Sequence, residues 1–460
     1  MTAKEMFEYT ANGINSQKYR VAQAWYSGDP NALRSSAEHG SFWKSSNRRK
    51  IHAPVAAELA GASADLLFGD APNMYVGIKE DTPKRFQYII DKNNISSLLC
   101  SAAEICAAYG DVYLKVNWDK ELADYPILSI VPPQNAYVAY KQGIAVEYYF
   151  LSFEQRTANG DGIWTFERYS KGEILEQTYD GSISRLGAMT SEDENKTGID
   201  EILAVHIPNA IPDNLTGSLN FGNSDITEVV SLLDALDETY SSWIRDVRLA
   251  KARIIVPMEY MRLKPDILNP NQRVFEFDKE DDTYVAMDID SSQVTSPITV
   301  SQFSIRAEEH EKTCAELLNR IVSSVGYAPQ TFGIDIAGNA QSGTALSLRL
   351  DKTLKTKAKK ETYWKQRLEV FLSAVLKLDN VLFKQKHAET AVSVEIKGNK
   401  NYLMGISETI NQLNQAAAVS IYTKVQLVHP DWDDTQILKE EHRIKLEQNI
   451  TVENTDDETY

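Results

Sequence analysis

Two short stretches of the sequence approach known ligand-binding motifs, and each lacks a required residue. Gly338 and Gly343 have the spacing of a phosphate-binding loop, but Thr344 stands where the lysine that reaches the phosphates is required. The segment Asp193–Gly198 resembles the start of a calcium loop, but its twelfth position is Ala204 in place of the glutamate that completes the calcium shell. We therefore predict neither nucleotide binding nor calcium binding.

The other side chains that catalyse reactions or bind metals are scattered along the sequence. The seven His show no metal-ligand spacing, and the motifs of dinucleotide folds, zinc peptidases and serine hydrolases are absent. The three Cys (Cys100, Cys106 and Cys314) contain no C-x-x-C pair, which excludes a disulfide framework and a cysteine-rich zinc site. We expect no catalytic residue, no cofactor and no metal, and a structural or interaction role in place of an enzymatic one.

Composition and charge limit the classes of protein further. The chain has 460 residues, which corresponds to about three domains, and its 43% hydrophobic content is that of a globular protein. No stretch approaches the roughly 18 apolar residues of a membrane helix, and the first residues lack the pattern of a signal peptide. We therefore expect a protein of the cytosol without a membrane partner.

The net charge bears on nucleic-acid binding. Lys and Arg number 48 against 65 Asp and Glu, a net charge of −17. A protein that grips DNA over a broad surface usually presents a positive face, so this chain should repel a duplex overall and touch one only locally.

The N-terminal half is predicted to change from helix to strand. Helices are expected over residues 1–30 and 52–70 and twice within 83–109, and the Ser-, Asn- and Arg-rich residues 31–50 read as a loop. An antiparallel meander is then predicted from short aromatic and β-branched runs separated by Gly, Asn and Pro. Its strands are Asp111–Trp118, Pro126–Val131, Ala136–Tyr140, Ala145–Phe153, Ile163–Tyr169 and Glu173–Tyr179. The polar segment Gly181–Glu201 reads as a surface loop.

Two long helices with regular apolar seams follow, separated by residues 253–299. The first helix covers 225–252, with Ser224 as its N-cap, and the second covers 301–325. Heptad positions of the first helix are Ile226, Leu233, Tyr240 and Val247, with Val229, Leu236, Trp243 and Ala250. The seam of the second is Phe303, Ala307, His310, Cys314, Leu317, Ile321 and Val325. This pattern predicts an antiparallel helical hairpin with a small insertion, in which His310 is a packed, hydrogen-bonded side chain. The seam fits either an internal bundle or helices that pack against copies of themselves.

A loop and a basic helix come next. Residues 326–341 contain three Gly and one Pro, and the helix predicted at 342–387 carries eleven Lys or Arg against four Asp or Glu. Arg349, Lys352, Lys355 and Lys359 recur at helical spacing and share one face. These cations are either solvated and paired with the acidic remainder of the chain, or a row that meets phosphates as DNA passes. A short strand (391–396), helices at 404–426 and 433–449 and an acidic tail complete the chain.

Four segments carry a resemblance to a known family. They are AGASADLLFGDAP at Ala60–Pro72, AYGDVYLKVNWD at Ala108–Asp119, IVPPQNAYVAY at Ile130–Tyr140 and the run from Gly326 into SGTALSLRL. In their order the sequence resembles the portal, or head–tail connector, proteins of tailed bacteriophages of the siphophage type, over about residues 1–430.

The resemblance implies a portal-type α+β fold with five parts. Residues 1–224 and 342–403 would form an α/β wing, and the helices 225–252 and 300–325 the stem. Residues 253–299 would form a small α/β clip, 326–341 a loop that projects into the tunnel, and 404–460 a helical crown with the acidic tail.

The resemblance also implies a function. The chain would form a ring, usually of twelve subunits, at one capsid vertex, through which double-stranded DNA passes without sequence specificity during packaging and ejection. Implied partners are the terminase large subunit, which would supply the force, head-completion or adaptor proteins, and the major capsid and scaffolding proteins. The protein would lie in the virion, and in the host cytoplasm during assembly. The alternative is a scaffold or adaptor of capsid assembly that forms no ring.

Candidate site residues follow from these assignments. The tunnel-loop candidates are Gln330, Thr331, Asp335, Asn339 and Gln341, and the DNA-contact candidates are Arg349, Lys352, Lys355 and Lys359. Packing of the stem against neighbouring subunits is assigned to Leu233, Leu236, Tyr240, Trp243 and Val247. Partner docking on the clip is assigned to Asp278, Lys279, Glu280, Asp281 and Asp282. Twelve upright helices, each about 10 Å across, give a circumference of about 120 Å and a lumen of roughly 28 Å, wide enough for a duplex of about 20 Å.

Overall fold

The computed structural model describes residues 1–13, 15–45, 49–77, 83–250, 253–255, 262–265, 273–276, 299–301, 304–334, 343–385, 387–396, 420–428, 432 and 434–447. The chain divides into two compact units. Met1–His39, Pro54–Leu233 and Asn319–Tyr460 form the first, here called the body unit; Gly40–Ala53 and Asp234–Leu318 form the second, here called the hairpin unit.

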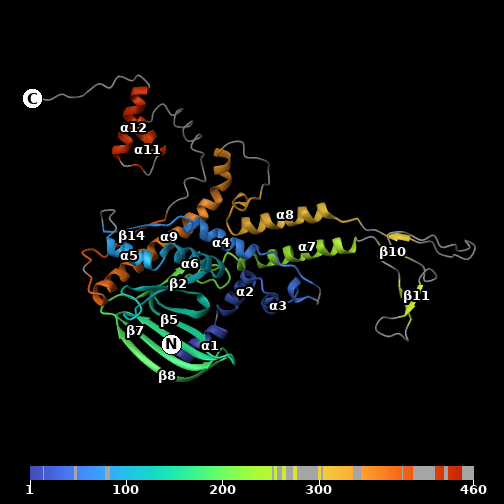
Figure 1. Ribbon diagram of the computed structural model, residues 1–460, viewed down its shortest axis with the longest axis horizontal. Helices are drawn as coiled ribbons and strands as arrows, with labels where there is room; N and C mark the ends of the chain where they lie inside the picture. The colour runs from blue at the N-terminus through green and yellow to red at the C-terminus, as the bar shows by residue number, and fades with distance from the viewer. Residues whose placement is uncertain are drawn as a thin grey trace, which may run out of the picture. The chain divides into compact units, whose positions relative to one another are not determined.

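The body unit combines helices with antiparallel strands, which confirms the predicted α+β class (Figure 1). Its helices are α1 (Ala3–Asn12), α2 (Ser16–Ser27), α3 (Pro30–Ser36), α4 (Val55–Phe68), α5 (Lys84–Lys92), α6 (Ile95–Tyr109), α9 (Gly343–Leu382), α11 (Ile421–Val428) and α12 (Asp434–Glu447). Its strands are β1 (Asn73–Val76), β2 (Asp111–Asn117), β3 (Ile127–Val131), β4 (Ala136–Lys141), β5 (Ile144–Gln155), β6 (Asp161–Ser170), β7 (Glu173–Ser182), β8 (Arg185–Lys196), β9 (Ala204–Pro208) and β14 (Val392–Glu395).

The main core lies around a three-stranded sheet of order β3-β2-β9. Helix α6 contacts β2 and β3, the 40-residue helix α9 contacts β9, and α4 contacts both helices. Trp364 of α9 is fully buried and meets Phe68 of α4 edge-on, with ring centroids 5.0 Å apart. Gly110 ends α6 in the left-handed region (φ 94°), and a Cβ there would lie 2.6 Å from the Gly222 carbonyl oxygen. Only glycine combines that backbone with so close an approach of two chain segments.

A five-stranded antiparallel sheet of order β4-β5-β6-β7-β8 curves beside this core (Figure 1). Successive side chains of a strand point to opposite faces, and both faces are used here. On β5, Tyr148 and Phe150 join the main core, whereas Tyr149 and Leu151 pack with α1 in a smaller core. A capping box between Thr2 and Glu5 starts α1.

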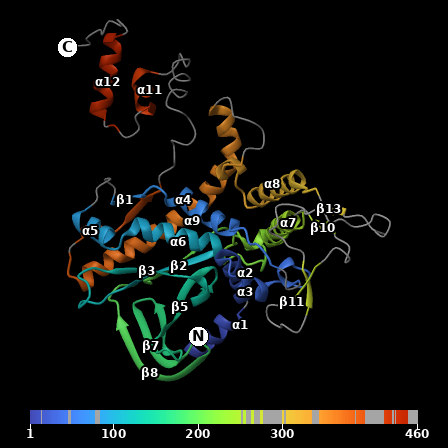
Figure 2. The same cartoon turned by 45° about the vertical axis from the view of Figure 1, so that its right-hand side comes forward.

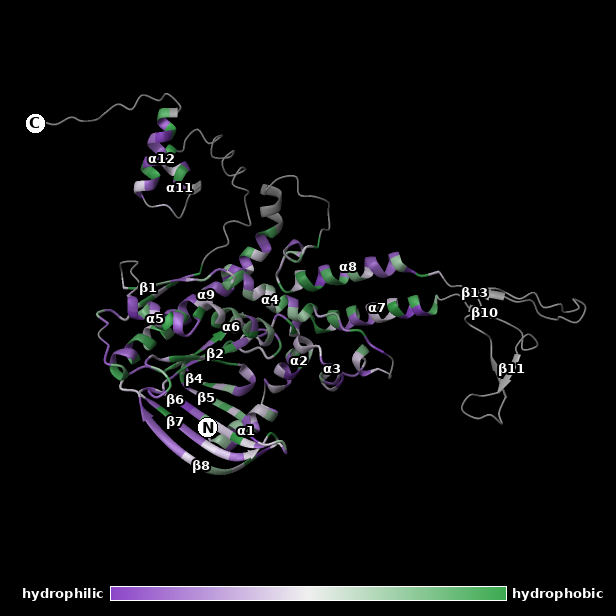
Figure 3. Cartoon of the chain, in the orientation of Figure 1, coloured by the Kyte–Doolittle hydropathy of each residue, from purple (hydrophilic) through white to green (hydrophobic). Residues whose placement is uncertain are grey.

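The structure corrects the predicted meander in two places. The strands of 136–179 form a meander, but β2 and β3 belong to the other sheet, where β9 pairs with β2. The segment Gly181–Glu201 is not a loop, because it contains the twelve-residue strand β8. This strand lies at the edge of its sheet and is exposed along nearly its whole length. Its sequence therefore lacks the apolar–polar alternation by which a half-buried strand is recognised. Its C-terminal half is hydrophilic (Figure 3).

One further expectation for this region was wrong. Residues 31–50 are not a loop throughout, because they contain most of α3 and the 3-10 helix η1 (Phe42–Lys44), where Asp29 and Ser41 cap the helix starts with their side chains. The segment from Asp193 that resembles the start of a calcium loop begins in the extended strand β8.

The hairpin unit contains most of α7 (Val230–Leu249) and α8 (Ala307–Ser324), with η1. Three short strands lie in the described part of the predicted insertion: β10 (Arg253–Ile255), β11 (Arg262–Pro265) and β12 (Arg273–Glu276). A fourth, β13 (Thr299–Ser301), crosses its predicted end at 299, and α8 begins at Ala307, later than the predicted residue 301. These four strands form two antiparallel pairs, β10 with β13 and β11 with β12.

The predicted helix starting at 225 begins with the 3-10 helix η3 (Thr227–Val229) before α7. The Ser224 hydroxyl accepts hydrogen bonds from the backbone of Ile226 and Thr227, so the predicted N-cap is confirmed. At the other end of the chain, α11 and α12 contact each other, and the Tyr422 hydroxyl donates to Asp434 at 2.8 Å. None of the helices in the described ranges is long and apolar enough to cross a membrane.

Candidate functional site

The helices α7 and α8 lie side by side in both views (Figures 1 and 2). Near the end of α7, the Asp246 carboxylate accepts from Arg306 (2.8 Å) before α8 and pairs with His310 Nε2 (3.0 Å) in its first turn. The His310 ring stacks on Trp243, with centroids 5.9 Å apart. These contacts confirm the antiparallel hairpin and the packed, hydrogen-bonded His310. The bonds from His310 and then Arg306 lower the pKa of Asp246.

The predicted seam of α7 is buried at its start and uncovered at its end. Leu233 and Leu236 are fully buried, Tyr240 and Trp243 are half-buried, and Val247 is 42% exposed. Other large apolar side chains near that end of the hairpin are also exposed, namely Ile244, Leu249 and Ile305. The hairpin therefore presents an apolar outer surface along with the hydrophilic positions visible in Figure 3.

The segment Gly40–Ala53 packs on the flank of α7 through two carboxylates. Asp237 accepts from the Trp43 indole (2.9 Å) and pairs with His52 Nδ1 (2.8 Å), and it is itself buried. Asp234 accepts from the Phe42 backbone at 2.7 Å. Sequence reasoning missed this site, because an acidic side chain on a helix is usually solvated and its partners here lie about 190 residues earlier.

Between this segment and α7 lies a cavity of about 380 Å³ with a basic lining, here called the basic pocket. Its charged side chains are Arg49, Lys50, Glu238, Arg245 and Arg248, and its hydroxyl side chains are Ser45, Ser241 and Ser242. The pocket concentrates positive charge in a chain whose net charge is −17.

A second buried set of side chains lies beside α9 in the body unit, and we call Asp225, Tyr327 and Lys360 the root cluster. Asp225 lies just before η3, and Tyr327 lies just after α8. The Lys360 ammonium contacts the Asp225 carboxylate and donates to the Tyr327 hydroxyl (2.9 Å) and to Ser63 of α4 (2.9 Å). Tyr327 donates to Asp225 at 3.1 Å.

The electrostatics of the root cluster keep it charged. Burial by itself lowers the pKa of the Lys360 ammonium, but the adjacent Asp225 carboxylate and the Tyr327 hydroxyl outweigh burial and raise this pKa overall. Burial, followed by the charge of Asp225, raises the pKa of Tyr327 to about 12. At neutral pH the cluster is therefore an ammonium–carboxylate pair bridged by a neutral phenol.

One signal for this cluster existed in the sequence. Thr353, Lys357, Lys360 and Trp364 are spaced as one face of a helix, and all four are buried. This spacing is hard to recognise in the sequence, because four of the five residues 357–361 are charged and the buried lysines look like their exposed neighbours. The DNA-contact hypothesis therefore concentrated on the opposite, solvent-exposed face.

On that exposed face, the structure places three of the four predicted cations. Lys352, Lys355 and Lys359 are exposed, whereas the side chain of Arg349 lies outside the described residues. The Lys355 ammonium pairs with Asp351 at 2.6 Å, and Lys352 donates to the Ser323 carbonyl. This local pairing agrees with the alternative in which the cations are solvated and paired within the protein. Lys359 remains available for a further partner.

The tunnel-loop candidates are only partly visible. Gln330 and Thr331 lie in the 3-10 helix η5 (Pro329–Phe332) and are half-buried, and the Thr331 hydroxyl meets the Thr353 hydroxyl of α9 at 2.9 Å. Asp335, Asn339 and Gln341 lie outside the described residues, as do the clip candidates Asp278, Lys279, Glu280, Asp281 and Asp282. The start of the loop is therefore fixed to α9 through a hydroxyl pair.

A further buried ion group connects the N-terminal helices to the sheet. The Lys18 ammonium pairs with Asp213 at 3.1 Å and lies 3.8 Å from Asp111. Asp111 also accepts from His206 Nε2 (2.8 Å), whose other ring nitrogen meets the Tyr140 hydroxyl at 2.6 Å. The charged and polar groups of these five side chains all have hydrogen-bond or ion-pair partners, so we interpret the group as a structural network.

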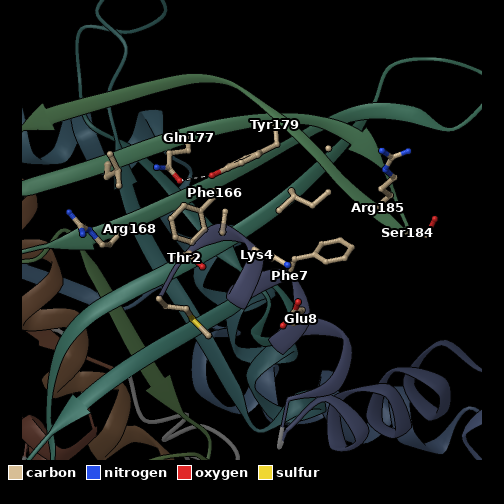
Figure 4. A pocket seen from close by; sticks show the side chains of 15 residues that line it. Thr2, Lys4, Phe7, Glu8, Phe166, Arg168, Gln177, Tyr179, Ser184 and Arg185 are labelled. Carbon is tan, nitrogen blue, oxygen red and sulfur yellow. Dashed lines mark hydrogen bonds between the residues drawn. The ribbon is translucent and has the colours of Figure 1, made fainter.

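A cavity of about 660 Å³ lies between α1 and the curved sheet (Figure 4). Lys4 and Phe7 approach it from α1, and Phe166 and Tyr179 from the strands. Sequence reasoning did not find it, because its walls come from the first residues and from a sheet more than 150 residues later.

The described residues offer little for catalysis. None of their His, Cys, Asp and Glu form a group of three or more that could hold a metal ion. Cys100, Cys106 and Cys314 are free thiols, and burial raises the pKa of each. A thiol with a raised pKa is a poor nucleophile at neutral pH.

Two solved structures resemble the chain at low sequence identity. No curated protein matches the sequence. One similar solved structure is the neck of a native GTA particle computed with C12 symmetry, at 12% identity and a TM-score of 0.46, covering 90% of this chain and 93% of that chain. Another is the neck of an empty GTA particle computed with C6 symmetry, at 11% identity and a TM-score of 0.48, covering 82% and 90%.

The family match spans nearly the whole sequence. Residues 14–453 match the family described as "Phage portal protein, SPP1 Gp6-like". This match confirms the resemblance that the sequence indicated and extends it beyond residue 430. The chain belongs to the SPP1 Gp6-like family of phage portal proteins.

Proposed function

We propose that the protein forms a ring at one vertex of a phage capsid and serves as the conduit for double-stranded DNA during packaging and ejection. Membership of the portal family supports this proposal. Within the chain itself, the main support for this proposal is the hairpin, whose outer surface exposes the apolar side chains Val247 and Ile305. A monomer gains nothing from apolar side chains there, whereas a ring of hairpins covers them.

The parts of the chain take distinct roles in this proposal. The hairpin of 225–252 and 300–325 is the stem, 253–299 the clip, and 326–341 the tunnel loop. Residues 1–224 and 342–403 are the wing, and the helices after 404 are the crown. The stem packs through Leu233, Leu236, Tyr240, Trp243 and Val247.

The charge of the chain suits passage of DNA without tight binding. Each phosphate contact adds affinity that movement must break, so a mainly acidic conduit keeps the duplex free to slide. Arg349, Lys352, Lys355 and Lys359 are the proposed transient contacts, and the tunnel loop touches the backbone without reading sequence. The chain itself is not an enzyme in this proposal, and the terminase large subunit supplies the force.

The other partners follow from position. The clip, including the acidic turn Asp278–Asp282, docks the terminase and later the head-completion or adaptor protein. The wing and crown face the major capsid and scaffolding proteins. The protein is thus placed in the virion, and in the host cytoplasm during assembly.

Ring formation distinguishes this proposal from the alternative of a scaffold or adaptor that forms no ring. Negative-stain electron microscopy and native mass spectrometry of the purified protein test it. We expect rings with a central hole and a mass near twelve times 51.7 kDa. Compact single particles that persist after capsid and scaffolding proteins are added would favour the adaptor.

A further inference from the structure

Charge is distributed unevenly around the hairpin unit. Residues 40–53 contain four Lys or Arg and no acid, and with Arg245 and Arg248 of α7 they give one flank a positive surface. Arg49, Arg245 and Arg248 are exposed and form no ion pair within the described part of the chain. This flank contains the basic pocket.

The first half of α8 carries the opposite charge. Residues 307–318 contain four Glu against one Lys. Glu308 pairs with that lysine, Lys312, at 2.6 Å, whereas Glu309, Glu311 and Glu316 are exposed and have no ion pair among the described residues. Glu311 follows the seam residue His310 and lies on the other side of the helix. Glu309 and Glu316 are seven residues apart and lie on one face, which we call the acidic row.

The basic pocket and the acidic row lie on opposite sides of the hairpin. In an antiparallel helix pair, the residues one position after a seam residue lie on the same side of the pair in both helices. The residues one position before a seam residue lie on the opposite side of the pair. Arg248 follows the seam residue Val247. Glu309 precedes the seam residue His310, and Glu316 lies on the same face. A single hairpin therefore cannot bring these charges together, but two neighbouring hairpins can.

The two surfaces also match in height along the hairpin. Trp243 stacks on His310, so Arg245 and Glu309 lie at one level. Toward the start of α7, Ser241 comes four residues (about 6 Å) earlier than Arg245. Its hydroxyl accepts a hydrogen bond from the backbone of Ile51, two residues after Arg49. Glu316 is displaced in the same direction by seven residues, about 10 Å, because α8 runs antiparallel.

We propose that the basic pocket of one subunit binds the acidic row of the next subunit, head to tail around the ring. The inference rests on the proposed ring and specifies its lateral contact. The occupant is a second copy of this chain, because the acidic row of a copy offers acids at the matching heights. The exposed Ile244 in the pocket lining supports a protein partner. A contact between two different surfaces closes into a ring when the rotation between subunits fits.

A charge-swap experiment tests the contact with full-length protein. The first variant, Arg245→Glu with Arg248→Glu, makes both sides of the hairpin acidic. The second, Glu309→Arg with Glu316→Arg, makes both sides basic. We expect each variant alone to lose at least tenfold in ring yield by native mass spectrometry. An equimolar mixture regains rings in which the two variants alternate, because each then meets its opposite.

Controls separate this contact from general effects. Lys120→Glu with Lys141→Glu makes the same charge change on exposed positions of the body unit and should leave ring yield unchanged. Recovery of rings on mixing shows that the single variants are folded, and circular dichroism checks each one alone.

Several results would overturn the inference. Wild-type yields of rings from either variant alone, or folded variants that do not assemble on mixing, exclude the contact while leaving the ring proposal intact. Normal rings of the first variant that lose DNA retention would assign the pocket to phosphates. A wild-type protein that never forms rings contradicts the proposed function itself and this inference with it.

Discussion

At the scale of single residues, Lys360 is an ammonium buried to 3% exposure in the middle of the longest described helix. Its three oxygen partners, on α4, before η3 and after α8, satisfy all three donors. An ion pair of this kind adds little stability relative to apolar residues of the same volume, but the loss of one partner strands the other charge. The root cluster therefore fixes which segments meet at α9.

Replacement of Lys360 by methionine measures that penalty. We expect Lys360→Met to lower the free energy of unfolding by about 3–5 kcal/mol, because Asp225 remains buried without its cation. The double variant Lys360→Met with Asp225→Asn should recover part of the loss. Urea unfolding followed by circular dichroism gives both values.

The neighbouring lysine is the matched control for this measurement. Lys359 is exposed, so Lys359→Met should change the free energy of unfolding by no more than about 0.5 kcal/mol. Equal losses from the two lysine variants would show that the buried pair carries no special weight.

Asp246 links stability to pH at the scale of one residue. Its pKa is lowered in the folded protein, so its bonds with His310 and Arg306 stabilise the fold at pH values above the usual aspartate pKa of about 3.9. This contribution is lost as the pH falls through the lowered folded value. We expect Asp246→Asn to destabilise the protein by at most about 1 kcal/mol at pH 7, because the pair is partly exposed. The difference from wild type should shrink below about pH 4 in urea unfolding series. A difference that stays constant down to pH 3 would contradict the assignment.

At the scale of elements, the hairpin changes character along its length. Near the start of α7 its seam is closed, and toward the end of α7 it is held by the stack of Trp243 on His310 and by polar contacts of Asp246. Trp243 is half-buried, so part of its ring remains available to another copy.

A charge at Trp243 should disrupt the hairpin and the proposed ring together. We expect Trp243→Asp to abolish rings or give aberrant ones, because a carboxylate replaces the stacked indole beside Asp246. Trp243→Phe keeps an aromatic ring and should retain assembly. Electron microscopy of both variants provides the comparison, and normal rings of Trp243→Asp would reject the seam assignment.

The exposed face of α9 has its own test. We expect Lys352→Glu with Lys355→Glu to leave ring assembly intact and to reduce DNA packaging or retention severalfold, because a transient phosphate contact becomes repulsive. Lys365→Glu with Lys384→Glu, also exposed, is the control for net charge. Packaging assays with both double variants decide, and unchanged packaging would leave these lysines as solvated, locally paired side chains.

Periodicity explains which elements could be predicted from the sequence. The helices α4, α6, α7 and α9 have strong apolar seams or glycine stops, and their predicted positions are confirmed to within a few residues. The edge strand β8 was missed because its outer positions are solvated, and β9 because all five of its residues are buried and give no alternation.

The sites were harder to predict than the elements for the same physical reason. The heptad pattern places Leu233 and Leu236 on the apolar face of α7, and both are buried within the single chain. Packing of the stem residues against a neighbouring subunit stays a prediction. The root cluster, the Lys18 network and the basic pocket join residues separated by 33 to about 200 positions. No local pattern records which distant carboxylate will meet a given lysine, and the tertiary fold decides it.

At the scale of the whole molecule, charge is separated by region. The net charge is −17, yet the basic helix α9 and the segment 40–53 are cationic. Within the proposed ring, this separation allows positive surfaces to serve lateral contacts and transient DNA contacts while the remainder repels the duplex. In the proposed ring, the net charge therefore influences solubility and the passage of DNA, whereas the local charged clusters determine where partners bind.

The packing of Gly40–Ala53 on α7 also has a consequence for synthesis. Trp43 is made 194 residues before its partner Asp237. At about 5–20 residues per second, the indole and its neighbours wait roughly 10–40 s on the ribosome before the helix that covers them exists. During that interval an aromatic segment without acidic residues is open to chaperones and to other nascent chains, so the rate of translation becomes a factor in how many subunits reach assembly.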